Sequence, residues 1–209
     1  MNTINPFSRP LYVMLKPVGA ACNLRCHYCY YLEKACLYKD SSKRVLSEEM
    51  LDQFTKEYIE AQTMNDVLFT WHGGEPLMRP LSFYRKALEL QKKYGRGRNI
   101  SNVIQTNGTL LTDEWCQFLH ENNWLVGVSI DGPQEFHDEY RRTASGGPSW
   151  AKVMRGIQLL NKHHVEWNAM AVVNDFNADY PLDFYHFFKE MGCRFIQITP
   201  VVERMVNHA

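Results

Sequence analysis

The chain has 209 residues, of which 45% are hydrophobic, enough to bury one substantial core. Its 23 basic and 23 acidic residues cancel, and no basic run offers a surface for nucleic-acid phosphates. The first ten residues are polar, and no apolar run approaches the ~20 residues that cross a bilayer. We therefore expect a cytoplasmic protein that binds neither nucleic acid nor a membrane.

Strand-like and helix-like patterns alternate from the N-terminus onward. An apolar run at 12–17 ends in proline, and 47–62 shows helical spacing behind Ser47, a candidate N-cap. A β-branched and aromatic run at 66–74 ends in two glycines. The amphipathic segment 81–95 ends at glycine, as helices commonly do. These segments predict a strand, a helix, a strand and a helix.

The same alternation continues to the C-terminus, with Thr112 as a second candidate N-cap. The stretch 134–149 is expected to be irregular. Strand patterns fall at 101–108, 124–133, 165–174 and 193–202, and helical patterns at 112–123, 150–164 and 179–192.

Six predicted strands separated by five helices indicate an α/β fold with a parallel sheet. The strands are nearly continuous in apolar residues, which predicts a sheet covered on both faces. An open doubly wound sheet and a curved partial barrel both fit this pattern. In either architecture, ligands bind beyond the carboxyl ends of the strands.

Segments that could form a binding or catalytic site follow the predicted strands one after another. A cysteine-rich loop follows the first strand, "GGEP" the second and "TNG" the third, and "SIDGP" ends the fourth. Because parallel strands end at one edge of the sheet, these segments are expected to share one rim.

Three of the six cysteines lie in a C-x3-C-x2-C pattern at Cys22, Cys26 and Cys29. A zinc site would need a fourth ligand, and His27 is awkwardly placed between two of the cysteines. A zinc site completed by a distant histidine is one interpretation. An iron–sulfur cubane held at three corners is the favoured one, because it leaves the fourth iron open to a small molecule.

The pattern C-x3-C-x-aromatic-C after a first strand resembles the signature of radical S-adenosylmethionine (SAM) enzymes. Together with "TWHGGEPLM", "QTNGTLL" and "VSIDGP", the segment "CNLRCHYCYYLEK" resembles the anaerobic sulfatase-maturating enzymes, over about residues 10 to 203. The resemblance implies a parallel six-stranded (β/α)6 partial TIM barrel, with residues 1–209 forming one radical SAM domain.

The resemblance also implies a set of site residues. Cys22, Cys26 and Cys29 correspond to the ligands of a [4Fe–4S] cluster whose open iron binds SAM. Arg141 is matched to the arginine that binds the SAM carboxylate, but Arg142 is adjacent to it, so the choice between these two arginines stays open. The implied SAM contacts are Tyr28 near the adenine, Gly73, Gly74 and Glu75 at the amino group, Ser129 as a hydroxyl contact, Arg141 at the carboxylate, and Val202 beside the adenine.

The chemistry of those positions agrees with the roles. Glycine lets backbone carbonyls approach an ammonium closely, and a guanidinium binds a carboxylate at two points. Simple packing is the alternative for Tyr28 and for Val202. His72 and Asn107 also end predicted strands on this rim, but we do not include them in the predicted site.

The activity implied by the resemblance begins with an electron from a donor such as a flavodoxin or ferredoxin. The cluster cleaves SAM to methionine and a 5′-deoxyadenosyl radical. The radical removes a β-hydrogen from a cysteine or serine in an unfolded sulfatase peptide, and further oxidation yields formylglycine.

The sequence departs from this family after its last predicted strand. The family continues with a C-terminal domain that carries two auxiliary clusters and an acidic base, and this chain ends at "VVERMVNHA" without them. We therefore expect the catalytic base to lie beyond this chain. Two alternatives are a radical SAM enzyme that modifies another peptide and a catalytically silent iron–sulfur or zinc-binding scaffold.

Overall fold

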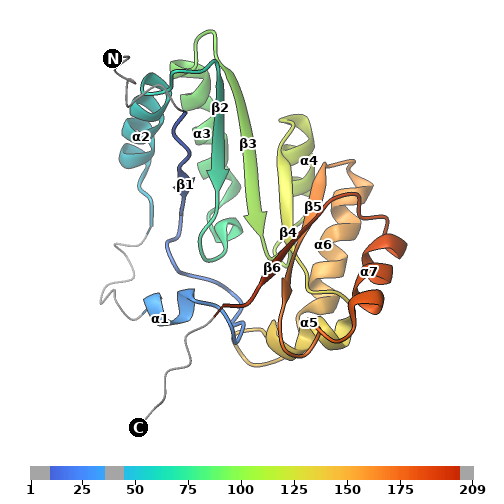
Figure 1. The fold of residues 1–209 in the computed structure, drawn as a ribbon. Coiled ribbons are helices and arrows are strands. Elements are labelled where there is room, and N and C mark those ends of the chain that lie inside the picture. Colours follow the sequence, from blue (N-terminus) through green and yellow to red (C-terminus); the bar gives the residue numbers. More distant parts are fainter. Residues whose placement is uncertain (1–9, 36–44, 203–209) are drawn as a thin grey trace, which may run out of the picture.

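The computed structural model describes residues 10–35 and 45–202. Its strands form one six-stranded parallel sheet in the order β1-β2-β3-β4-β5-β6 (Figure 1). The strands are β1 (Met14–Leu15), β2 (Asp66–Trp71), β3 (Asn99–Thr106), β4 (Leu125–Ser129), β5 (Trp167–Val173) and β6 (Ile196–Pro200).

The sequential strand order decides between the two predicted architectures. A doubly wound sheet reverses its order at a switch point, and no such reversal occurs among these strands. Right-handed crossovers between successive neighbours place the connecting helices on one face, as in a TIM barrel. Figure 1 shows the helices along the outer side of a curved, open sheet. The partial TIM barrel is therefore confirmed.

Both predicted N-caps are confirmed. The hydroxyls of Ser47 and Thr112 each accept a hydrogen bond at 3.2 Å, from the backbone N–H groups of Met50 and Trp115. The helices are α1 (Tyr31–Ala35), α2 (Glu48–Glu60), α3 (Leu81–Tyr94), α4 (Asp113–Glu121), α5 (Gln134–Tyr140), α6 (Trp150–Lys162) and α7 (Pro181–Glu190), with a 3₁₀ turn at Pro76–Met78.

The stretch 134–149 was expected to be irregular, and the structure corrects this. Its first seven residues form α5, on which Phe136, His137 and Asp138 are buried. A helix of two turns is too short to show a clear apolar period and depends on tertiary packing for its stability. That dependence explains why the sequence pattern alone did not indicate it.

The prediction of a sheet covered on both faces is wrong. In β2, Val67, Phe69 and Trp71 are buried, whereas the alternating residues Leu68 and Thr70 are only half-buried. One face therefore packs against the helices, and the other faces the hollow of the partial barrel. The open hollow matters for function because it leaves room for a ligand beside the strand ends.

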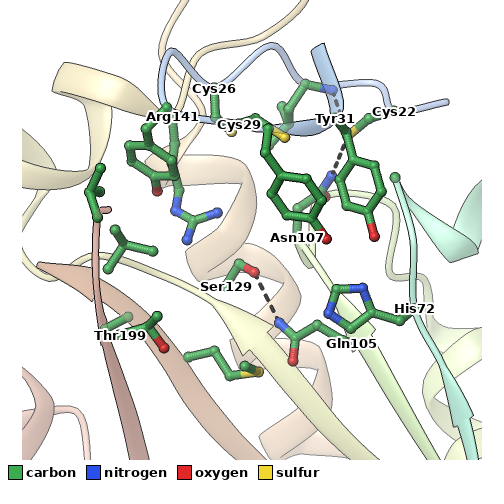
Figure 2. Close-up of a pocket in the computed structure, with 18 of the residues that line it drawn as sticks. Cys22, Cys26, Cys29, Tyr31, His72, Gln105, Asn107, Ser129, Arg141 and Thr199 are labelled. Atoms are coloured by element: carbon green, nitrogen blue, oxygen red, sulfur yellow. Dashed lines mark hydrogen bonds between the residues drawn. The ribbon is translucent and has the colours of Figure 1, made fainter. Parts of the chain in front are cut away.

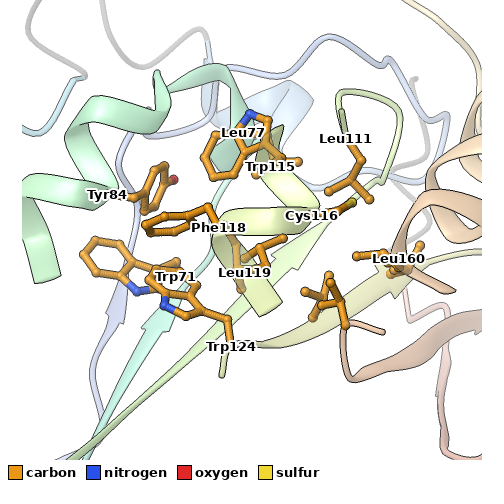
Figure 3. Packing of buried hydrophobic residues seen from close by; sticks show 14 of the residues in the cluster. Trp71, Leu77, Tyr84, Leu111, Trp115, Cys116, Phe118, Leu119, Trp124 and Leu160 are labelled. Carbon is orange, nitrogen blue, oxygen red and sulfur yellow. The ribbon is translucent and has the colours of Figure 1, made fainter. Parts of the chain in front are cut away.

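An aromatic cluster fills the space between the sheet and helices α3 and α4 (Figure 3). The rings of Trp71 and Trp124 stack with centroids 6.0 Å apart, and Tyr84 meets both edge-on. Trp71 ends β2, directly before the "HGGEP" segment. This packing fixes the carboxyl end of β2, at the rim, against the start of β4. None of the helices in the described ranges is both long and apolar enough to span a membrane.

Candidate functional site

A cavity of about 550 Å³ opens at the carboxyl ends of the strands (Figure 2). All of the predicted site residues except Glu75 line it. The lining includes Cys22, Cys26, Tyr28, Cys29, Gly73, Gly74, Ser129, Arg141 and Val202. The expected common rim is therefore present, and residues up to 180 positions apart in the sequence meet there.

The cysteine loop is held in place by the last residue of α5 and by the segment that follows it. Arg25 N–H donates to the carbonyl of Arg142 at 2.8 Å, and His27 N–H donates to that of Tyr140 at 2.9 Å. A backbone bridge joins Leu24 to the same segment. The conformation of the loop thus depends on a stretch more than a hundred residues away.

The thiols of this loop suit metal-bound thiolates. Two N–H groups point at the sulfur of Cys22, the backbone N–H of Leu24 at 3.3 Å and the side-chain amide of Asn107 at 3.7 Å. Burial raises the pKa of Cys22 to about 11 and also raises the pKa of Cys26. The free thiols of Cys22 and Cys26 are therefore protonated near neutral pH, and a bound metal is what would deprotonate them.

The arrangement fits a cluster better than a single ion. In the parts of the chain that the structure describes, no three His, Cys, Asp or Glu side chains surround one common metal position. A cubane binds each thiolate at a different corner, so its ligands lie farther apart than those of one ion.

The glycines of "GGEP" allow two chain segments to touch. A Cβ atom on Gly74 would lie 1.9 Å from the carbonyl oxygen of Ala21, and Gly73 has φ +117°. The N–H groups of Gly74 and Glu75 donate to the carbonyls of Gly19 and Ala21, each at 2.8 Å. The glycine pair therefore fixes the turn that leads from β1 into the cysteine loop.

The carboxylate of Glu75 is fully buried and does not reach the cavity. It accepts hydrogen bonds from Thr106 Oγ1 at 2.7 Å, from the N–H of Asn107 at 2.7 Å and from the N–H of Leu77 at 2.9 Å. Burial raises the pKa of Glu75 to about 7. In this position the side chain joins the "GGEP" turn to the end of β3, whereas a direct contact with a ligand was expected.

Ser129 faces the cavity from the end of β4. Its oxygen accepts a hydrogen bond from the side-chain amide of Gln105 at 3.0 Å (Figure 2). With its oxygen engaged in this way, the Ser129 hydroxyl is left to donate its own proton to a ligand. Gln105 lines the cavity too, and the sequence-based prediction did not include it.

The two adjacent arginines occupy different environments. Arg141 is buried, lines the cavity, and binds the carboxylate of Asp131 through Nε at 2.8 Å and Nη2 at 3.0 Å. Arg142 does not line the cavity, and its Nε lies 3.5 Å from the carbonyl oxygen of Glu139. Between the two, the geometry favours Arg141 as the ligand-binding residue.

Asp131 organises this side of the cavity. Besides Arg141, it accepts the hydroxyl of Tyr28 and, at 2.9 Å, the N–H of Val172. Burial is the main cause that raises the pKa of Tyr28, and the phenol therefore stays protonated as a donor. One carboxylate thus connects the cysteine loop, α5 and β5.

The remaining lining residues complete the walls of the cavity. His72 accepts a hydrogen bond from the N–H of Gly73 through Nδ1 at 2.7 Å, and burial lowers the pKa of its ring. Asn107 lines the wall next to Cys22. Both end strands on the rim, and that position was the sequence signal for them. Val202 is 89% exposed at the cavity mouth, which does not agree with a core-packing role.

The model of the radical SAM superfamily matches residues 17–188, and the chain belongs to this superfamily. The sheet order, the three-cysteine loop and the cavity at the strand ends agree with that assignment.

Among curated proteins, a serine-type anaerobic sulfatase-maturating enzyme of Bacteroides thetaiotaomicron is 73% identical over 207 residues, covering 99% of this chain and 50% of that protein. A cysteine-type enzyme of Clostridium perfringens is 35% identical over 189 residues, covering 90% of this chain and 51% of its own length. The chain therefore spans about half the length of the curated relatives it matches.

Solved structures that contain bound S-adenosylmethionine are also similar to this chain. Native anSMEcpe with bound AdoMet and the Cp18Cys peptide superposes with a TM-score of 0.86 at 33% identity, covering 96% of this chain and 54% of that one. Streptococcus suis SuiB bound to S-adenosylmethionine, at 13% identity and a TM-score of 0.67, shares the fold.

Proposed function

We propose that this chain is the SAM-cleaving domain of an anaerobic sulfatase-maturating enzyme, with a [4Fe–4S] cluster on Cys22, Cys26 and Cys29. The observation that carries the proposal is that these thiols line the same cavity as Ser129 and Arg141. The 73% identity to the serine-type enzyme supports the substrate class. When bound, the cluster supplies the electron that cleaves SAM into methionine and a 5′-deoxyadenosyl radical.

The protein prepares the cluster site by the way it holds the loop. The thiols of Cys22 and Cys26 are protonated before metal binding, so assembly releases protons, and affinity for the cluster rises with pH. Donors to Cys22 stabilise the thiolate once it forms. The backbone bonds from Arg25 and His27 keep the three sulfurs facing the cavity.

The polar groups of the cavity match the polar groups of SAM. Arg141 binds Asp131 through Nε and one N–H of Nη2, so Nη1 and the second N–H of Nη2 are the donors proposed to bind the SAM carboxylate. The Ser129 hydroxyl donates a further hydrogen bond to the ligand. The backbone of Gly73 and Gly74 faces the SAM amino group, and Tyr28 and Val202 border the adenine.

The substrate is proposed to be a cysteine or serine of an unfolded sulfatase peptide. The 5′-deoxyadenosyl radical removes one β-hydrogen, and a second electron and a proton are then lost, the electron to an auxiliary cluster proposed to lie in the region that this chain does not span. Serine gives the aldehyde of formylglycine directly, whereas cysteine gives a thioaldehyde that water hydrolyses to the aldehyde with release of hydrogen sulfide. We propose that the acidic base comes from the region of the relatives that this chain does not span. The reductant is proposed to be a flavodoxin or ferredoxin in the cytoplasm.

Anaerobic reconstitution with iron and sulfide, followed by an assay for 5′-deoxyadenosine, tests the core of the proposal. We expect the wild-type protein to cleave SAM under reduction and Cys26→Ala to lose this activity. Cys193→Ser is the matched control, since Cys193 lies outside the cavity and bonds to the carbonyl of Phe195. Failure of a cluster-loaded wild-type protein to cleave SAM would overturn the proposal and favour a silent scaffold.

The substrate class is tested by adding a sulfatase peptide and weighing the product. Conversion of serine removes two hydrogens, whereas conversion of cysteine also exchanges sulfur for oxygen, so the mass identifies the residue that was oxidised. SAM cleavage with an unchanged sulfatase peptide, in a protein that includes the relatives' second half, would point to a different peptide substrate.

A further inference from the structure

The side-chain amide of Asn107, at the end of β3, points at the sulfur of Cys22, with Nδ2 and Sγ 3.7 Å apart (Figure 2). We propose that Asn107 raises the reduction potential of the cluster at this site, which makes the cluster easier to reduce. The inference rests on the proposed function, because it requires a cluster on Cys22.

The orientation of the Asn107 amide is determined by its neighbours. Its Oδ1 accepts two hydrogen bonds from Thr109, one from the backbone N–H at 3.0 Å and one from the hydroxyl at 2.7 Å. The oxygen therefore belongs on the Thr109 side, and the NH₂ group must face Cys22 and Asn23. Nδ2 also donates to Asn23 Oδ1 at 2.9 Å.

The network around Asn107 closes on itself. Asn23 Nδ2 donates to the hydroxyl of Thr109 at 2.8 Å, and the backbone N–H of Asn107 donates to the buried carboxylate of Glu75 at 2.7 Å. Asn107 is only 7% exposed. The amide is thus held from both ends and shielded from water. It cannot turn away from the sulfur without breaking several buried hydrogen bonds.

A donor held in this way acts differently on the two oxidation states. Reduction adds negative charge that spreads over the cluster and its thiolates, and hydrogen bonds to sulfur stabilise that charge. The oxidised state gains less from the same bond. Since the Asn107 amide is fixed in place, it does not have to reorient when the cluster is reduced. Loss of the donor should therefore shift the midpoint potential to more negative values.

A purely structural role is the competing interpretation. Asn107 joins the cysteine loop to the end of β3, and in that role its loss would lower stability or cluster content without changing the potential of the cluster that remains. The midpoint potential separates the two interpretations, because it is measured only on protein that holds a cluster.

The test is a potentiometric titration of the reconstituted protein, followed by electron paramagnetic resonance and carried out without SAM. For Asn107→Ala we expect the ratio of reduced to oxidised cluster, at the wild-type midpoint, to fall at least about fivefold. A fivefold fall in that ratio corresponds to a midpoint potential that is more negative by roughly 40 mV for a one-electron couple. Gln105→Ala is the matched control, since Gln105 lines the same cavity but has no bond to a cysteine, and its midpoint should equal that of the wild type.

Thr109 provides a second, independent pair of variants. Thr109→Ala removes the hydroxyl that holds the amide oxygen and should produce a smaller shift in the same direction. Thr109→Ser retains the hydroxyl and should leave the midpoint unchanged. If Asn107→Ala does not retain iron, the Thr109 pair decides the question, and equal midpoints for both members overturn the inference.

The outcomes also separate this inference from the proposed function. A wild-type protein that takes up no cluster overturns the proposed function. A wild-type protein that holds a cluster, with Asn107→Ala at the same midpoint, leaves the proposed function standing and overturns the role of Asn107. A more negative midpoint in Asn107→Ala, with iron content equal to that of the wild type, supports the inference.

Discussion

Arg141 and Asp131 form a two-point ion pair beneath the candidate SAM cavity, with Nε 2.8 Å from Oδ2 and Nη2 3.0 Å from Oδ1. The side chain of Arg141 is 10% exposed and that of Asp131 is fully buried. Because a buried charge without a partner is costly, each residue requires the other. The pair links the orientation of the arginine to the position of the cysteine loop through Tyr28.

Asp131→Asn should destabilise the protein strongly. The substitution keeps the shape but removes the charge that compensates Arg141, and breaking one partner of a buried pair costs about 3–5 kcal/mol. We expect a drop of that size in the free energy of unfolding, measured by urea denaturation. Asp113→Asn is the control, since Asp113 pairs with Lys162 on an exposed surface, and it should change stability little. Equal effects of the two substitutions would contradict the assignment.

Substitutions of Arg141 and Arg142 should have different effects on the affinity for SAM. Arg141→Ala is expected to raise the dissociation constant for SAM at least about tenfold, because a charge-assisted bond to the carboxylate is lost. Arg142→Ala should bind like the wild type, because Arg142 does not line the cavity. Equilibrium binding with cluster content determined in parallel checks both. An unchanged affinity in Arg141→Ala would move the carboxylate contact elsewhere.

His137 makes the stability depend on pH. The imidazole is fully buried, and burial, with Arg141 as a further cause, lowers its pKa from 6.5 to about 4. The unfolded chain thus binds a proton that the folded protein rejects. The resulting contribution of neutral, buried His137 to the free energy of unfolding is fully present above about pH 6.5 and is lost as the pH falls toward 4. It amounts to about 3 kcal/mol at most, at 1.36 kcal/mol per pKa unit.

Substitution isolates this contribution of His137. His137→Gln should give an unfolding free energy that changes less between about pH 4 and 6.5 than that of the wild type. The raised pKa of Glu75 acts with the opposite sign, since that carboxyl loses stability as pH rises from 4.5 to about 7. Both proteins share that contribution, so it cancels in the difference. His120→Gln, at an exposed histidine, should keep the wild-type profile.

Gly74 should not accept a side chain. The Cβ of Gly74→Ala would lie 1.9 Å from the backbone oxygen of Ala21, so the entry to the cysteine loop must shift. Overpacking of this kind typically costs about 1–3 kcal/mol, and we expect both lower thermal stability and weaker retention of iron. Gly147→Ala, whose Cβ would meet only Thr143 Oγ1 at 3.3 Å, is the control. Similar losses in both variants would contradict the close-packing argument.

Several features of the site could be predicted from the sequence because they depend on residues close together along the chain. The spacing of Cys22, Cys26 and Cys29 lies within one loop. The caps at Ser47 and Thr112 depend on groups three residues away. The position of each motif at a strand end follows from alternating patterns, and parallel strands bring those ends to one edge.

Other features depend on contacts that local patterns do not contain. Sequential strand order distinguishes the partial barrel from a doubly wound sheet, and that order is a property of the assembled sheet. Helix α5 exists because its buried face has a partner in the folded protein.

The tertiary structure also decided what each polar side chain of the rim does. Glu75 lies beneath the cavity and bonds to Thr106 at the end of β3. Arg141 binds Asp131 through one side of its guanidinium. Asn107 contacts the sulfur of Cys22, 85 residues away in the sequence. The sequence determined that these groups share one rim. Their pairing was decided by strand register and by the need of each buried polar group for a partner, which exist only once the chain is packed.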